Sequence, residues 1–136
     1  MTAFTHQDWI GKAAAIRFRD QAFIDGKFVP ARSGRRFASI NPATGETLAE
    51  VASCGEEDID LAVAAARRSF EAGAWSRAAP AHRKAVLLRL AELLRENLHE
   101  LALLASLDMG KLVNDAVAVD VPGSAGIFHW YAEAID

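Results

Sequence analysis

The feature that most constrains this chain is a change in its hydrophobic period near Ser53. Before this residue, short apolar runs flank turn sequences such as FIDGKF and NPATGE, whereas after it apolar residues recur every three to four positions. The first pattern is typical of short strands and the second of amphipathic helices. The sequence therefore predicts a small β unit at the front of the chain, followed by helices.

Two β-hairpins are predicted within residues 21–53. Asp25-Gly26 separates the runs AFI and KFV, and Asp-Gly suits the two positive φ angles of a tight hairpin turn. The runs FASI and TLAEVA flank the second turn, where Asn-Pro and Thr-Gly steps favour a reversal of the chain. Residues 1–20 precede this unit and are predicted to hold an amphipathic helix, capped by Thr5 and Asp8.

Residues 54–136 are predicted to be helical, divided by capping and helix-breaking residues. We expect a first helix that begins with a Ser53/Glu56 capping box and ends at Gly73. Pro80 suits the first turn of a second helix, and a third helix is expected to stop near Gly110. Long stretches of the chain should therefore present one apolar face each.

The last part of this tract is expected to be interrupted. Pro122-Gly123 should separate a short helix from a final helix that carries Trp130 and Tyr131. The earlier helices carry apolar stripes formed by Ile59, Val63, Phe70, Leu90, Leu94, Leu101 and Leu104. Stripes of this size have to be buried against another element.

Composition argues against several partners and compartments. The formal net charge of -3 gives no electrostatic reason to expect binding to nucleic acid or to an anionic membrane surface. Charged residues interrupt the leucine-rich stretch 86–107, so no apolar run approaches the length of a membrane span. The single cysteine, Cys54, has no partner for an internal disulfide, and the start MTAFTHQDWIGK lacks the apolar core of a secretion signal. We therefore expect a cytoplasmic protein.

No complete active site is predicted from the residues alone. Cys54 precedes a predicted helix, whose dipole would favour a thiolate, but no histidine lies near it in sequence, and a small half-buried structural residue is the preferred interpretation. The four histidines lack the short spacings of zinc ligands. No glycine-rich phosphate loop is found. The residues alone thus indicate an α+β piece without a catalytic site.

Four signatures occur in a recognisable order: INPATGE, EDIDLAVAAARRSFEAGAW, LDMGK and WYAEAID. Together they resemble the beginning of an NAD(P)-dependent aldehyde dehydrogenase, from about Ala22 to Asp136. The resemblance implies the α/β aldehyde dehydrogenase fold, N-terminal part only, with residues 54–136 as the helical part of an incomplete cofactor-binding domain. The opening helix and the tail are most similar to enzymes acting on γ-glutamyl-aminobutyraldehyde and other ω-amino aldehydes. One departure is Leu112, where the family usually has proline.

The resemblance also implies a chemistry. The family uses thiolate attack on the aldehyde, hydride transfer to NAD or NADP, and hydrolysis of the thioester by a general-base glutamate. Its cysteine, its glutamate and its phosphate-binding glycine turn are expected beyond residue 136, so no catalytic or cofactor-binding residue is assigned here. The chain is then expected to be a truncated, inactive part of a homo-oligomeric enzyme, or to self-associate through exposed helices.

Two lesser sites follow from the resemblance. Family members often hold a monovalent cation through backbone oxygens that correspond here to Ser39 and Ile40 and through the aspartate that corresponds to Asp108; the alternative is that Asp108 only caps the turn at Gly110. Asp120 and Gly123 match positions at the mouth of the substrate tunnel, where a carboxylate favours an aldehyde with a cationic far end. The alternative for Asp120 is an ordinary surface position on a helix.

Three hypotheses from different classes remain open. The first is the N-terminal portion of an aldehyde dehydrogenase. The second is a non-catalytic interaction module that associates with dehydrogenase subunits, and the third is an unrelated helical binding domain. An open reading frame that continues past codon 136 into a cofactor-binding strand and a catalytic cysteine would separate the first from the second.

Overall fold

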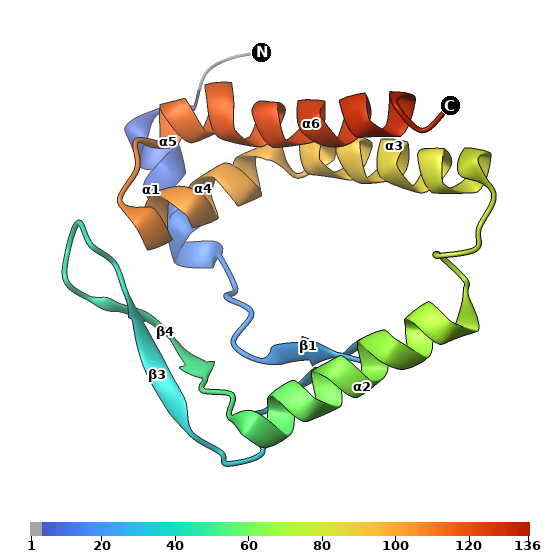
Figure 1. Ribbon diagram of the computed structural model, residues 1–136. Coiled ribbons are helices and arrows are strands. Elements are labelled where there is room, and N and C mark those ends of the chain that lie inside the picture. Colours follow the sequence, from blue (N-terminus) through green and yellow to red (C-terminus); the bar gives the residue numbers. More distant parts are fainter. Residues whose placement is uncertain (1–3) are drawn as a thin grey trace.

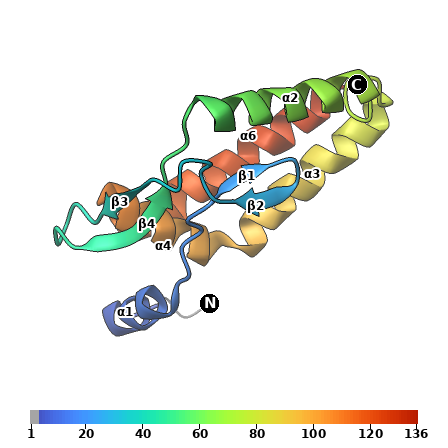
Figure 2. The same cartoon turned by 90° about the horizontal axis from the view of Figure 1, so that it is seen from below.

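The computed structural model describes residues 4–136, which form an open ring of helices and two hairpins (Figures 1 and 2). In chain order the elements are α1 (His6–Ala15), β1 (Ala22–Ile24), β2 (Lys27–Val29), β3 (Arg36–Ile40), β4 (Thr47–Ala52), α2 (Glu56–Ala72), α3 (Pro80–Glu96), α4 (Leu98–Met109), α5 (Val113–Asp115), the π-helical turn η1 (Ala116–Asp120) and α6 (Val121–Glu133). The helices α3 and α6 run side by side along one edge of the ring, and α2 lies along the opposite edge (Figure 1). The expected architecture of small antiparallel hairpins followed by helices is confirmed.

Both predicted hairpins form. β1 pairs with β2 antiparallel, and the turn residues Asp25 and Gly26 have φ of 54° and 76°, as a tight turn with two positive φ angles requires. β3 pairs with β4 antiparallel. The second turn is closed by a hydrogen bond of 2.8 Å from the Asn41 N–H to the Glu46 carbonyl oxygen. The turn chemistry read from the sequence thus fixes both reversals of the chain.

The predicted cap of α1 is present. The Asp8 N–H donates to the Thr5 hydroxyl at 3.2 Å, and the Thr5 N–H donates to the Asp8 carboxylate at 2.8 Å. The Thr5 hydroxyl, which donates to the Asp8 carboxylate at 2.7 Å, and then the Thr5 N–H hold the pKa of the Asp8 carboxyl below its usual value. The ring of Trp9 lies 5.9 Å from that of His99, between centroids, so α1 packs on α4.

The start of α2 differs from the prediction. The helix begins at Glu56 with Gly55 as its N-cap, so the expected Ser53/Glu56 capping box is wrong. The physical reason is that the Ser53 N–H is already committed to the hairpin, where it donates to the Arg35 carbonyl oxygen at 2.8 Å. Asp58 takes over the capping role.

Asp58 joins α2 to the hairpin unit. Its side chain is buried, with 3% of the residue exposed, and accepts hydrogen bonds of 2.9 Å from the N–H groups of Gly55 and Arg32. The bond from Gly55, followed by that from Arg32, holds the pKa of the Asp58 carboxyl below its usual value. A buried carboxylate with two backbone donors therefore fixes the β unit against the first long helix.

The expected break at Pro122-Gly123 is also wrong. The chain stays helical from Val113 to Glu133, because the π-helical turn η1 precedes the proline. In this wider turn the Val121 N–H donates to the Ala116 carbonyl oxygen. Pro122 has no N–H to offer to the helix, and the wider π-helical turn directly before it is where the hydrogen-bond pattern changes to accommodate the proline.

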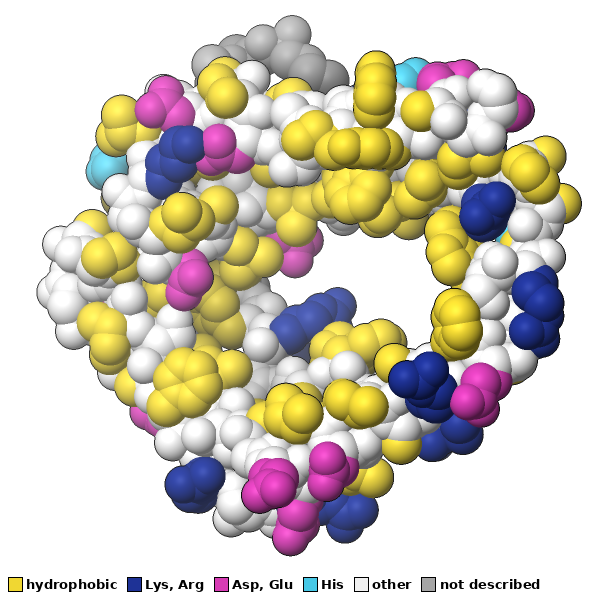
Figure 3. Space-filling view, viewed as in Figure 1, with side chains coloured by type: hydrophobic (Ala, Val, Ile, Leu, Met, Phe, Trp, Pro, Cys, Tyr) yellow, Lys and Arg dark blue, Asp and Glu magenta, His cyan; other side chains and the backbone are white. Residues whose placement is uncertain are grey.

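The core of the described residues is small, and many large apolar side chains are exposed. The buried apolar residues are six alanines, Leu103 and Val121, and within 4–136 no large side chain is fully buried. The exposed ones include Ile59, Val63, Phe70, Ile127, Trp130 and Tyr131. Figure 3 shows apolar side chains gathered on the rim of the central opening.

No helix in 4–136 has both the length and the hydropathy required to cross a bilayer.

Candidate functional site

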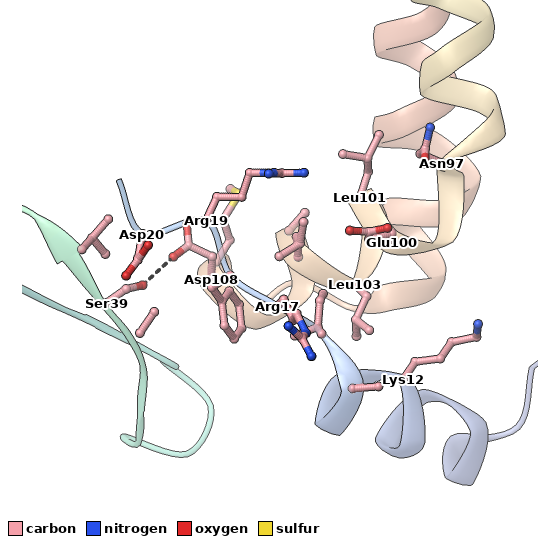
Figure 4. A pocket seen from close by; sticks show the side chains of 18 of the residues that line it. Lys12, Arg17, Arg19, Asp20, Ser39, Asn97, Glu100, Leu101, Leu103 and Asp108 are labelled. Carbon is pink, nitrogen blue, oxygen red and sulfur yellow. Dashed lines mark hydrogen bonds between the residues drawn. The ribbon is translucent and has the colours of Figure 1, made fainter. Parts of the chain in front are cut away.

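The second hairpin is fastened to the end of α4 by a hydrogen bond between residues far apart in sequence. The Ser39 hydroxyl on β3 donates to the Asp108 carboxylate at 2.9 Å (Figure 4). Both residues line a cavity of about 1380 Å³ that is also bordered by the connector after α1. Arg17 and Arg19 from that connector line the same cavity. The structure therefore brings together two of the three residues predicted for a cation site.

Ile40, the third predicted residue, lies next to Ser39 at an irregularity of the sheet. The pairing of β3 with β4 changes register between Ser39 and Ile40, and a bulge of this kind interrupts the ladder of backbone hydrogen bonds. The predicted donor set is thus the backbone oxygens of Ser39 and Ile40, at a point where the ladder is irregular, and the Asp108 carboxylate. Oxygen donors of this kind suit a hard cation.

A second contact fastens the same hairpin to α4. Gly110 ends α4 in the left-handed region with φ of 71°, and the ring of Pro42 lies against it. A Cβ atom on Gly110 would lie 2.9 Å from Cγ of Pro42. Glycine is required here for both its backbone conformation and its size.

The two residues predicted for the tunnel mouth lie at the junction of η1 and α6. Asp120 ends the π-helical turn and forms an ion pair of 2.7 Å with the Lys111 ammonium. Gly123 lies one turn further on, and nothing stands within 4 Å of a Cβ built on it. The Asp120 carboxylate is thus already paired, and a Cβ on Gly123 would meet open space. No sequence signal predicted the partner, because a spacing of nine residues across a loop matches no regular element.

Comparison with known proteins places these features in a family. A sequence model of the aldehyde dehydrogenase family matches residues 28–136. The chain belongs to the aldehyde dehydrogenase family. It is 51% identical over 132 residues to aminoacetaldehyde dehydrogenase of Pseudomonas aeruginosa, an alignment that covers 97% of this chain and 27% of that enzyme. The chain therefore spans about a quarter of the length of this curated relative.

Solved structures of aldehyde dehydrogenases have the same fold over nearly all of this chain. A γ-glutamyl-γ-aminobutyraldehyde dehydrogenase from Burkholderia cenocepacia superposes with a TM-score of 0.95 and 53% identity, over 98% of this chain and 27% of the other. An indole-3-acetaldehyde dehydrogenase in complex with NAD+ gives a TM-score of 0.96 and 48% identity over the same shares of the two chains. The relatives thus include enzymes named for an amino aldehyde and for an aromatic one.

Two further positions bear on the aldehyde dehydrogenase assignment. Leu112, where the resemblance leads us to expect proline, has φ of -60° and is 72% exposed. Proline fixes φ near -65°, so the backbone keeps the conformation that proline would impose.

Cys54 is exposed, which corrects the expectation that it is half-buried. Within residues 4–136, no cluster of three or more histidine, cysteine or acidic side chains is arranged to bind a metal ion.

A strand-to-helix junction, the usual place of a phosphate-binding turn, lies between β4 and α2. Its helix begins with three acidic residues, Glu56, Glu57 and Asp58, and the Gly55 N–H is already bonded to Asp58. Negative charge at a helix N-terminus repels an anionic pyrophosphate rather than binding it. The residues at this junction do not fit NAD or NADP.

The contact between Pro42 and Gly110 generates a test. Replacing Gly110 with alanine should lower the free energy of unfolding by about 1–2 kcal/mol for the left-handed backbone, plus about 1–3 kcal/mol for the clash with Pro42. Gly26→Ala is the matched control, because Gly26 also has positive φ but nothing lies within 4 Å of its added Cβ. Urea unfolding of both variants measures the difference, and equal losses would show that the hairpin does not press on α4.

Proposed function

We propose that this chain forms part of an NAD(P)-dependent enzyme that oxidises an aldehyde to the carboxylic acid. The observation that carries the proposal is the match to the aldehyde dehydrogenase family over residues 28–136. Two further facts support it: the chain spans 27% of its curated relative, and its helices expose faces rich in large apolar side chains. Both are expected of a segment that packs against further structure.

In this proposal residues 1–136 are scaffold. Their proposed division is a helix in 1–20, a hairpin unit in 21–53 and the helical part of a cofactor-binding domain in 54–136. The nicotinamide cofactor would accept the hydride from the substrate, and no described residue is assigned to hold it. The exposed apolar faces support an oligomeric enzyme, and the single cysteine supports a cytoplasmic location, because one thiol forms no internal disulfide.

The substrate class in this proposal is an aldehyde with a cationic or amide-bearing far end, such as an ω-amino or γ-glutamylamino aldehyde. The names of two relatives, an aminoacetaldehyde and a γ-glutamyl-γ-aminobutyraldehyde dehydrogenase, support this class. Asp120 would face the far end of the substrate, and Gly123 would leave room for it. A carboxylate in a partly dehydrated mouth favours a cation over a neutral group.

The test uses the enzyme expressed from the complete reading frame that contains this chain. We expect NAD(P)+-dependent oxidation of a short ω-amino aldehyde, and in Asp120→Asn a KM for this substrate raised about three- to tenfold. The KM for a neutral aliphatic aldehyde should change little, because it makes no charged contact with Asp120. Asp115→Asn, an exposed aspartate on α5, is the control.

Equal effects of Asp120→Asn on both aldehydes would mean that Asp120 is a structural residue. A reading frame that stops at codon 136, or a protein without aldehyde oxidation, would contradict the proposed function itself.

A monovalent cation held by Ser39, Ile40 and Asp108 is a second part of the proposal. Oxygen donors and the irregularity of the β3–β4 ladder support it, while the cavity is lined both by the arginines and by the carboxylates Asp20 and Glu100, so it has no strong excess of negative charge. Weak, millimolar binding of K+ or Na+ is therefore expected, with Asp108 supplying the only formal charge of the set.

Thermal unfolding in potassium or sodium chloride, compared with choline chloride at equal ionic strength, tests this cation site. A tenfold excess of cation over its Kd stabilises the native state by about 1.4 kcal/mol. The wild type should show this gain and Asp108→Asn should lose it, whereas Asp60→Asn, at an exposed position of α2, should keep it. The same unfolding temperature in all three salts would contradict the cation site.

A further inference from the structure

The ion pair between Lys111 and Asp120 joins two segments that flank the proposed tunnel mouth. The ammonium of Lys111 lies 2.7 Å from each carboxylate oxygen of Asp120. Lys111 belongs to the connector between α4 and α5, and Asp120 ends η1. A lysine that contacts both oxygens neutralises the charge which the proposed function assigns to substrate recognition.

We propose that Lys111 is a specificity-determining residue that competes with the cationic end of an ω-amino aldehyde for Asp120. The inference rests on the proposed function, because it takes Asp120 as a residue that faces the incoming aldehyde. Lys111 has no proposed role in bond making or breaking. Its effect is on which aldehydes bind well, through the charge that they meet at the mouth.

The backbone of Lys111 is held in place on both sides, so that its side chain starts from a fixed point. The Ser106 hydroxyl donates to the Lys111 carbonyl oxygen at 2.6 Å. Gly110 before it is packed on Pro42. After it, the Leu112 carbonyl oxygen accepts hydrogen bonds from the N–H groups of Asp115 and Ala116. The Lys111 side chain thus reaches Asp120 from a backbone that is restrained by these contacts.

The pair is accessible enough to be displaced. The side chains of Lys111 and Asp120 are 36% and 37% exposed, so solvent and a solute reach both groups. Ion pairs at this exposure are weak, since water and salt screen them. By contrast, Lys84 is 24% exposed and is held by both Glu133 and Asp136, at 2.9 and 2.7 Å. Lys84 therefore offers a lysine whose ion pairs lie away from the proposed mouth.

Competition between the Lys111 ammonium and the substrate for Asp120 predicts a change in the KM of cationic aldehydes alone. A cationic aldehyde has to displace the Lys111 ammonium before it pairs with Asp120, whereas a neutral aldehyde leaves the pair intact. Removing the ammonium therefore strengthens binding of the cationic substrate alone. Given the strength of exposed ion pairs, the expected change is about two- to fivefold in KM.

The experiment compares KM and kcat for a short ω-amino aldehyde and for a neutral aliphatic aldehyde of similar length, in the enzyme that contains this chain. In Lys111→Met we expect the KM for the amino aldehyde to fall about two- to fivefold, with kcat and the KM for the neutral aldehyde unchanged. Lys111→Arg keeps the positive charge and should keep the wild-type ratio of the two KM values. Lys84→Met is the control for loss of a lysine elsewhere and should also keep that ratio.

Each other outcome overturns the inference. A Lys111→Met enzyme with an unchanged KM ratio but a lower unfolding temperature would show that the pair only fastens the connector to η1. If Asp120→Asn is selective while Lys111→Met is not, the proposed function stands and the competition is absent. If the wild-type enzyme oxidises neither aldehyde, the proposed function fails and the role of Lys111 fails with it.

Discussion

The structure depends on one constraint: its helices carry more apolar surface than the described residues can bury. The core is built largely from alanines packed where α3, α4, η1 and α6 meet. Large residues such as Ile59, Phe70 and Trp130 are more than half exposed. Burying one such side chain stabilises a protein by about 1.5–3 kcal/mol, and a whole domain is stable by only about 5–15 kcal/mol. The exposed faces therefore represent stabilisation on the scale of an entire fold.

The short segment from Asp108 to Leu112 connects the features that bear on function. Asp108 accepts the hydrogen bond from Ser39, Gly110 packs against the ring of Pro42, and Lys111 forms an ion pair with Asp120. Three separate parts of the chain, the second hairpin, α4 and η1, are thereby fixed relative to one another. Three positions of the LDMGK signature each contact a different residue outside it, and these contacts explain why those residue types stand there.

Local chemistry explains why much of this fold follows from the sequence. Asp25-Gly26, Gly73 and Pro80 act through their own backbone preferences, so their turn, helix end and helix start were predicted correctly. Ser53 failed as a cap because its N–H donates to the carbonyl oxygen of Arg35, just before β3.

The distinction between local backbone preference and contacts with distant residues also applies to the end of the chain and to the site. The break expected at Pro122 was absorbed by a π-helical turn that depends on packing against α4. Asp108 and Asp120 were selected through the family signatures, whereas Lys111 as the partner of Asp120 depends on a loop whose path has no periodic pattern. The partner of the Ser53 N–H, the π-helical turn and the partner of Asp120 all depend on tertiary structure, and the sequence left these unpredicted.

We infer that the exposed apolar faces of this chain need structure outside residues 1–136 to cover them. Sedimentation combined with amide hydrogen exchange on purified residues 1–136 tests it most directly. We predict self-association, or a monomer whose amides in α2 and α6 exchange rapidly, because the exposed apolar faces lack a cover. A monodisperse monomer with slow exchange across residues 56–107 would contradict the claim and would favour an autonomous interaction module.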